Sequence, residues 1–312
     1  MTESHRPPES LLEGLPNITR RIVDAGCNIM ETDINNPTFM HAVLCQVGLP
    51  RSRVEGRTFE RTNGKASIFI EAGHMPTLFG RWVEAPLPYG VKPRLVMHYM
   101  CSEAIRTQSP FITLDQSMNK FLERLGIGNG NSRQLKAFKQ QMLSLSTCSM
   151  KLAFFDGNRV RMTKADPVKK FDAWLSPDVN QKALWDDHIE LGQDFFETLC
   201  EHAVPLDPRA IHALQHSALA MDVYTWLAHR LCRVRKKDGV KLSWRNLKEQ
   251  FGQEYKCSKD FKRSFKDALM KARSVYAHAD IDIVMGGLLL KPSPPPIKKT
   301  QIVVPMIEKA SR

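Results

Sequence analysis

Long apolar runs are missing from this sequence of 312 residues, in which no stretch of 18 uncharged apolar residues occurs. That is about the shortest run that makes a membrane-spanning helix. The N-terminus, MTESHRPPES, also lacks the basic and then apolar order of a signal peptide. We therefore expect a cytoplasmic protein that does not bind a membrane. A charged fraction of 25% and a hydrophobic fraction of 42% are typical of globular proteins, and the length suggests two domains.

Motifs for metal binding and catalysis are also missing. The seven cysteines form no C-x-x-C pair and no close Cys/His cluster, so we expect small core residues, not disulfides or a zinc site. No G-x-x-x-x-G-K loop occurs, no H-x-H motif of a rolling-circle nickase occurs, and His212 and His216 lack the glutamate of a zinc-protease helix. We expect no catalytic residue, no metal and no cofactor, and therefore a binding protein, not an enzyme.

A nuclease or primase is the alternative from another functional class. Asp186 and Asp187, followed by Glu190, could suggest a metal-dependent nuclease. Adjacent side chains point in different directions, however, and these acids lie within an acidic stretch. We interpret them as a solvated surface.

Negative charge is scarce: 45 Lys and Arg oppose 33 Asp and Glu, a net charge of +12. Residues 230–273 hold 15 basic and 5 acidic side chains, and residues 131–170 hold 9 and 2. Between them, residues 180–225 hold 2 basic and 8 acidic side chains. Two basic blocks with helical apolar spacing, separated by an acidic one, predict two surfaces for a polyanion such as nucleic acid.

The order of predicted elements suggests a duplicated fold. Residues 1–36 are polar and interrupted by prolines, so we expect a flexible segment, and residues 37–47 show the spacing of a helix. Residues 57–71, around Asn63-Gly64, predict a β-hairpin. A helix then begins near Pro93.

Helix, strand, helix, turn, helix and hairpin follow over residues 93–163 and again over residues 207–290. The segments SMNKFLERLG (117–126) and SWRNLKEQFG (243–252) are offset by 126 residues, and we interpret them as equivalent helices. The prediction is an α+β, mostly helical fold of two tandem winged helix-turn-helix domains. Their expected bounds are residues 37–171 and 172–296, followed by a tail at 297–312.

In a helix-turn-helix the second helix lies in the DNA major groove. In the C-terminal domain this helix is predicted over residues 259–276, with Phe261, Phe265 and Leu269 buried. Its polar side carries the candidate DNA-binding residues Lys259, Lys262, Arg263, Lys266 and Arg273. The spacing i, i+3, i+4 places the first four on one face without interleaved acids. The alternative is an ordinary solvated basic face.

The N-terminal domain offers a second set. Its corresponding helix carries Arg133, Lys136, Lys139 and Gln140, and the following hairpin carries Lys151, Arg159, Arg161 and Lys164. The hairpin cations suit the phosphates or the minor groove, as in a wing. Arg263 and Arg133 are our candidates for base contacts, because bidentate Arg–guanine pairs are the commonest specific contact.

Several longer segments resemble the family of plasmid-encoded RepA replication initiators. In the C-terminal half these are AVPLDPRAIHALQHSALAMDVYTWLAHRL (203–231), LSWRNLKEQFG (242–252), FKRSFKDAL (261–269) and GLLLKPSPPP (287–296). The N-terminal half agrees through LPYGVKPRLVMHYMCSEAIRTQSP (87–110) and SMNKFLERLG (117–126). The resemblance covers roughly residues 37–297.

The resemblance implies a bacterial protein that binds direct repeats (iterons) in double-stranded plasmid origin DNA. Such proteins help to melt the adjacent AT-rich DNA and bring in the host initiator and helicase. Analogy with other iteron initiators adds a possible homodimer. A transcriptional repressor of a plasmid operon is the alternative, because the same DNA-binding architecture would serve it.

Overall fold

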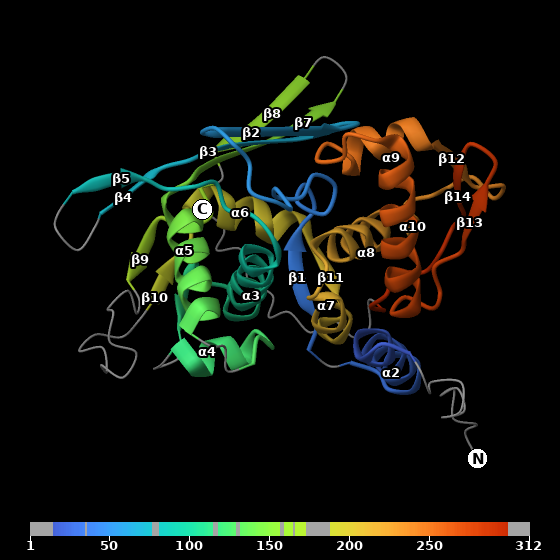
Figure 1. Cartoon of the computed structure of the whole chain (residues 1–312), viewed down its shortest axis with the longest axis horizontal. Helices are drawn as coiled ribbons and strands as arrows, with labels where there is room; N and C mark the ends of the chain where they lie inside the picture. Colours follow the sequence, from blue (N-terminus) through green and yellow to red (C-terminus); the bar gives the residue numbers. More distant parts are fainter. Residues whose placement is uncertain are drawn as a thin grey trace, which may run out of the picture. The chain divides into compact units, whose positions relative to one another are not determined.

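The computed structural model describes residues 15–34, 36–76, 81–114, 118–128, 132–156, 159–164, 166–172 and 188–298. The chain divides into two compact units (Figure 1). The terminal unit joins Met1–Thr38 to Val204–Val303, and the middle unit contains Phe39–Ala203 with Val304–Arg312. Among the described residues, no helix is long and apolar enough to cross a membrane.

The described part of the terminal unit contains five helices and a small sheet. Its elements are α2 (Asn17–Glu31), β11 (Ala203–Leu206, whose first residue belongs to the middle unit), α7 (Pro208–Leu214), α8 (Ala218–Leu231), β12 (Val240–Ser243), α9 (Trp244–Phe251), α10 (Ser258–Ser274), β13 (Ile281–Val284) and β14 (Gly287–Leu290). The apolar face of α10 packs on the buried helix α8. Antiparallel strands in the order β12-β14-β13 complete the unit.

Side chains at the helix starts determine where these helices begin. The Asp207 carboxylate accepts a hydrogen bond from the backbone N–H of Arg209 (2.9 Å), and Pro208 fills the first position of α7. Ser217 and Ser243 cap α8 and α9 in the same way. Gly287 is required by close packing, because a Cβ atom there would lie 1.8 Å from the carbonyl oxygen of Leu242.

The prediction that residues 1–36 form a flexible segment is wrong for residues 17–31, which form α2. This helix packs on α7 and α10, and its Ile22 is 2% exposed. The Arg209 guanidinium holds the end of the helix by donating hydrogen bonds to Asn28 Oδ1 (2.8 Å) and Thr32 Oγ1 (2.6 Å). Pro16 directly precedes the helix, a position where proline does not interrupt it.

The middle unit contains three sheets, one of them a two-stranded hairpin, and four helices among its described residues. Its elements are β1 (Thr38–His41, whose first residue belongs to the terminal unit), β2 (Thr58–Asn63), β3 (Ala66–Glu71), β4 (His74–Pro76), β5 (Trp82–Glu84), α3 (Val91–Thr107), β6 (Phe111–Thr113), α4 (Met118–Arg124), α5 (Ser132–Thr147), β7 (Ser149–Asp156), β8 (Arg159–Lys164), β9 (Lys170–Asp172), β10 (His188–Glu190) and α6 (Gln193–His202). The larger sheet is antiparallel in the order β2-β3-β7-β8, and a smaller one has the order β6-β10-β9. Strands β4 and β5 form a separate hairpin.

Both predicted hairpins of this unit are confirmed, and they share one sheet because β3 pairs with β7. The helix predicted over residues 37–47 is wrong. Residues 38–41 form β1, which is buried along its whole length. In a strand that is buried on both faces, apolar and polar residues do not alternate, so its apolar run can be mistaken for part of a helix.

The division between the two compact units falls between Ala203 and Val204. The boundary between winged-helix domains after residue 171 stays a prediction. Strand β10 pairs with β6 and β9 of the middle unit, and the N–H of Leu191 donates to the carbonyl oxygen of Pro110 (2.9 Å). Residues 188–203 therefore belong with the middle unit. The expected caps Asp115 and Ser117, residues 1–14 and nearly all of the predicted tail lie outside the described residues.

The element order that predicted a duplicated winged helix is present in both units, but the strand pairing differs. In the terminal unit β12 pairs with β14 of the hairpin, whereas in the middle unit β6 pairs with β10 and not with β7 or β8. The two units therefore have the same order of elements but a different pattern of strand pairing. The winged helix-turn-helix assignment stays a prediction.

Packing of α2 can be tested at Gly26. A Cβ atom there would lie 2.1 Å from the backbone carbonyl oxygen of Ser274, so Gly26→Ala should destabilise the protein by about 1–3 kcal/mol. In an exposed helix the same change would stabilise by about 1 kcal/mol. Urea unfolding measures the difference, with Met30→Ala, a change at an exposed position of the same helix, as the control. A stabilised Gly26→Ala variant would contradict the packing of α2 on α10.

Stability should also depend on pH through His41. Burial and the nearby His202 lower the pKa of His41 from 6.5 to about 4. Between pH 6.5 and 4, His41 is therefore protonated in the unfolded chain and neutral in the folded chain. As the pH is lowered through this range, the free energy of unfolding should fall by about 1.4 kcal/mol per pH unit. In His41→Asn the side-chain oxygen can still accept a hydrogen bond from the N–H of Val43. The contribution of residue 41 to the pH dependence of the unfolding free energy should then vanish. An unchanged slope in urea titrations would contradict the prediction.

Candidate nucleic-acid interface

The candidate site of the terminal unit lies on α10. Phe261, Phe265, Ala268, Leu269 and Ala272 form its buried face. All five predicted cations on this helix are exposed: Lys259, Lys262, Arg263, Lys266 and Arg273. Because the apolar side chains recur at helical spacing, burying them turns the cations toward solvent.

The structure brings four of these five cations together. Lys259, Lys262, Arg263 and Lys266 line one shallow hollow, and we call this set the basic face. Arg273 lies about two turns further along the helix, at its C-terminal end, and does not line the hollow. Four closely spaced cations on an open surface suit an extended anion more than a compact one.

The basic face is interrupted by one acid, contrary to the prediction. Asp260 Oδ1 lies 3.3 Å from the Arg263 Nη2 atom. The Arg263 side chain is 81% exposed, and an ion pair of this kind contributes about 0–1 kcal/mol. Breaking this ion pair therefore costs little, and the Arg263 guanidinium stays accessible from solvent.

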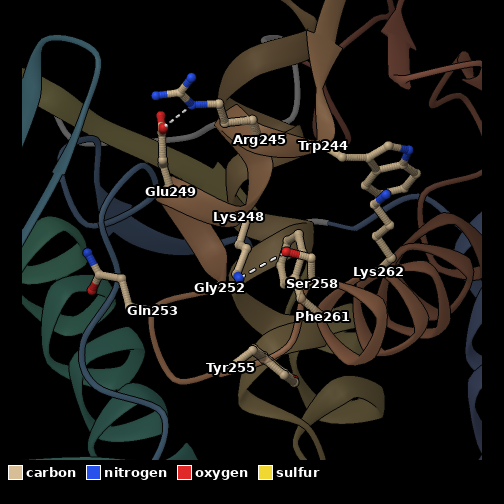
Figure 2. Close-up of a pocket in the computed structure, with 10 residues that line it drawn as sticks. All are labelled: Trp244, Arg245, Lys248, Glu249, Gly252, Gln253, Tyr255, Ser258, Phe261 and Lys262. Carbon is tan, nitrogen blue, oxygen red and sulfur yellow. Dashed lines mark hydrogen bonds and ion pairs between the residues drawn. The ribbon is translucent and has the colours of Figure 1, made fainter.

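Trp244, the first residue of α9, connects the basic face to the rest of the unit. The Nζ atoms of Lys262 and Lys266 lie 5.9 and 5.6 Å from the centre of its ring, within the range of a cation–π interaction. The same ring packs edge-on against Phe265 (6.2 Å between centres). Figure 2 shows the Lys262 amine directed toward the indole.

The backbone of Trp244 also fixes the β13–β14 hairpin. Its N–H donates a hydrogen bond to the carbonyl oxygen of Gly286 in the turn (3.0 Å). Sequence reasoning missed Trp244, because nothing in its spacing distinguishes a core tryptophan from one that supports charged neighbours. The hairpin turn consequently lies beside the basic face.

Two further cations on α9 were also missed. Arg245 and Lys248 line a second hollow together with residues from the turn and from α10 (Figure 2). Lys248 Nζ donates to Ser258 Oγ (3.0 Å) and so links the two helices, and Arg245 pairs with Glu249 (3.0 Å). The signal available in the sequence was their position in the first helix of the predicted motif.

The hairpin of the terminal unit is not basic. Lys291 lies 2.9 Å from Asp282 and 3.5 Å from Asp280, and the hydrogen bond to Asp282 raises the pKa of the lysine. Two carboxylates therefore oppose one ammonium, and this group is net negative. The positive charge of this surface is therefore concentrated on α9 and α10.

The middle unit carries its predicted cations on two separate elements. On α5, Arg133, Lys136 and Gln140 are exposed, and Lys139 is partly buried. The neighbouring Gln141 is buried and accepts a hydrogen bond from the N–H of Tyr89 (2.8 Å), which fixes the orientation of the helix.

On the β7–β8 ribbon (Ser149–Lys164), Arg159, Arg161 and Lys164 are exposed on the edge strand β8. The Nζ atom of Lys164 lies 3.3 Å from Asp166. Lys151 is half-buried, and its Nζ atom lies 5.5 Å from the centre of the Phe69 ring.

No group of three or more His, Cys, Asp or Glu side chains that could hold a metal ion occurs among the described residues. Asp186 and Asp187 lie outside those residues, and Glu190 pairs with Lys169 (2.7 Å). What the described surfaces offer chemically is hydrogen-bond donors and positive charge.

Comparison with known proteins shows which family the chain belongs to. A family model described as plasmid encoded RepA protein matches residues 87–246, just over half of the chain. No curated protein sequence matches. Two crystal structures of domains 2 and 3 of RctB, one of them of selenomethionine derivatives, superpose with a TM-score of 0.45 and 10% identity. They cover 77% and 74% of this chain and 83% of each RctB chain. A likeness this weak supports no inference about function.

The family match includes the whole of the segments 87–110, 117–126 and 203–231, on which the resemblance rested, and it covers α7, α8 and the start of α9. Since the match extends over more than half of the sequence, the chain belongs to the family of plasmid-encoded RepA replication proteins.

Proposed function

We propose that this protein initiates plasmid replication by binding repeated sequences (iterons) in double-stranded origin DNA. In this proposal it promotes melting of the adjacent DNA and recruits the host initiator and replicative helicase without catalysing a reaction. The observation that carries the proposal is the basic face, four cations on one side of α10, two of them packed against Trp244. The family match supports replication as the setting.

The charges suit a DNA backbone. A lysine or arginine that neutralises a phosphate releases condensed counterions, which gives affinity without sequence preference. Lys259, Lys262 and Lys266 are the proposed phosphate contacts, because an ammonium carries little directional information. Arg263 is the proposed base contact, since its planar guanidinium can donate two parallel hydrogen bonds to guanine.

In the terminal unit, α9, α10 and the β13–β14 hairpin would act as a winged helix with α10 in the major groove. In the middle unit, α5 and the β7–β8 ribbon would make the second contact, with Arg133 as its base contact. The charges of that unit lie on two elements, so we assign it phosphate contacts for the most part. A homodimer fits this proposal but is not required by it.

The DNA contact can be tested by replacing Lys262, Arg263 and Lys266 together by alanine. Footprints on the origin repeats should disappear while the melting temperature stays nearly unchanged, because all three side chains are exposed. The slope of log affinity against log salt should become less negative by about 0.9 for each lost phosphate contact. The matched control removes three exposed cations before β12, Arg235, Lys236 and Lys237, and should retain the footprint. Retained footprints in the first variant would refute the proposed site.

Replication itself is tested by plasmid maintenance. The gene with its flanking DNA should sustain a plasmid that lacks any other origin, and the triple alanine variant should not. Direct repeats about 21 bp apart, two helical turns, are expected beside an AT-rich block. If the wild-type protein folds and binds DNA yet no plasmid is maintained, and a single inverted repeat covers the promoter, the protein is a repressor.

A further inference from the structure

The solvent-facing side of the β2-β3-β7-β8 sheet carries large apolar side chains. On β7 and β8, Phe155, Val160 and Met162 are 37%, 60% and 68% exposed. The opposite side of the sheet packs on the core through Ile68, Ile70, Met150 and Leu152, although Phe154, near the end of β7, is 37% exposed there. An antiparallel sheet with one face on the core normally places polar residues on the other. The exposed apolar residues therefore call for a ligand.

The strand register gathers these residues into one strip. Phe155 lies opposite Val160, Ala153 opposite Met162, and Lys151 opposite Lys164, and Phe69 of β3 lies opposite Lys151. We call this set the apolar strip. Its two aromatic rings, Phe69 and Phe155, lie four positions apart along the sheet, about 13 Å.

Charge decides between two possible occupants of the strip. On the side of the β7–β8 ribbon that bears the strip, the cations are Lys151 and Lys164, whereas Arg159 and Arg161 alternate to the other side. The nearest acid on the strip's side is Glu60 of β2, which lies opposite Phe69. A second copy of the chain paired along this strip would oppose like charges, which is destabilising. A polyanion with apolar surfaces of its own satisfies both the cations and the exposed side chains.

We propose that the apolar strip binds single-stranded DNA. Bases would stack on the ring of Phe155, with Val160, Met162 and Phe69 extending the apolar surface, while Lys151 and Lys164 pair with phosphates. Paired bases are already stacked on each other, so only an unpaired strand can offer base faces to such a surface. This inference rests on the proposed function for the source of that strand, which is DNA melted at the origin.

The test uses the full chain and fluorescein-labelled oligothymidylate, with fluorescence anisotropy as the readout. Phe155→Ala should weaken binding at least about fivefold, the effect of losing one stacked base. Phe155→Leu keeps an apolar side chain without a flat ring and should show the same loss, whereas Phe155→Trp should bind at least as tightly as wild type. Phe111→Ala, at a phenylalanine 58% exposed on β6, is the matched control and should bind normally.

The two DNA surfaces should be separable. The Lys262, Arg263 and Lys266 triple alanine variant should bind oligothymidylate as wild type does, and Phe155→Ala should still give footprints on duplex repeats. Failure of wild type to bind oligothymidylate, or equal affinity of the Phe155→Ala and Phe155→Leu variants with wild type, would overturn the proposal without affecting duplex recognition. If Phe155→Ala instead dissociates a dimer in sedimentation equilibrium and leaves oligothymidylate binding intact, the strip is an interface between copies.

Discussion

Aromatic packing beneath α10 determines where the charge of the terminal unit is displayed. Phe261 and Phe265 are fully buried, with ring centres 5.5 Å apart, and Phe251 lies 5.4 Å from Phe265. Burying one such ring contributes about 1.5–3 kcal/mol. Rotating the helix enough to bury Lys262 would expose these rings and leave an ammonium without water or a partner, which is strongly unfavourable. The core therefore fixes the orientation of the basic face.

Trp244 shows how the core and the surface are joined. Its ring packs edge-on against the buried Phe265 and lies within cation–π range of two lysine amines, and its backbone N–H donates a hydrogen bond to the turn of the hairpin. Each cation–π contact is worth only about 0.5–1 kcal/mol at an exposed site. Their effect is on position more than on stability, because they restrain two flexible lysines above one rigid ring. A surface restrained in this way loses less conformational entropy when it binds a ligand.

Amphipathic elements were predictable from the sequence, and elements buried on all sides were not. The buried positions of α10 and the pairing of both hairpins follow from periods of 3.6 and 2. Strand β1 has no exposed face, so its apolar and polar residues do not alternate and the sequence does not distinguish it from a helix. The partner of β6 lies more than 70 residues away in β10, and no local signal encodes such a pairing. On the site, the cations could be listed from the sequence, but neither Trp244 nor the acid beside Arg263 could be assigned to it.

The net charge of the chain is a poor guide to the charge of these surfaces, because some acidic side chains, such as Asp207, are buried. Asp207 is 1% exposed and receives two hydrogen bonds from the Arg209 guanidinium (2.7 and 3.0 Å) while capping α7. The same guanidinium reaches the end of α2. Asp207 and Arg209 together contribute nothing to the net charge of +12, yet their hydrogen bonds stabilise the ends of two helices. Lys259, Lys262 and Lys266 contribute three positive charges and cap no helix. Charge that holds the fold and charge that faces a ligand are thus carried by different residues. A substitution on the basic face can therefore remove positive charge while the stability of the unit is preserved.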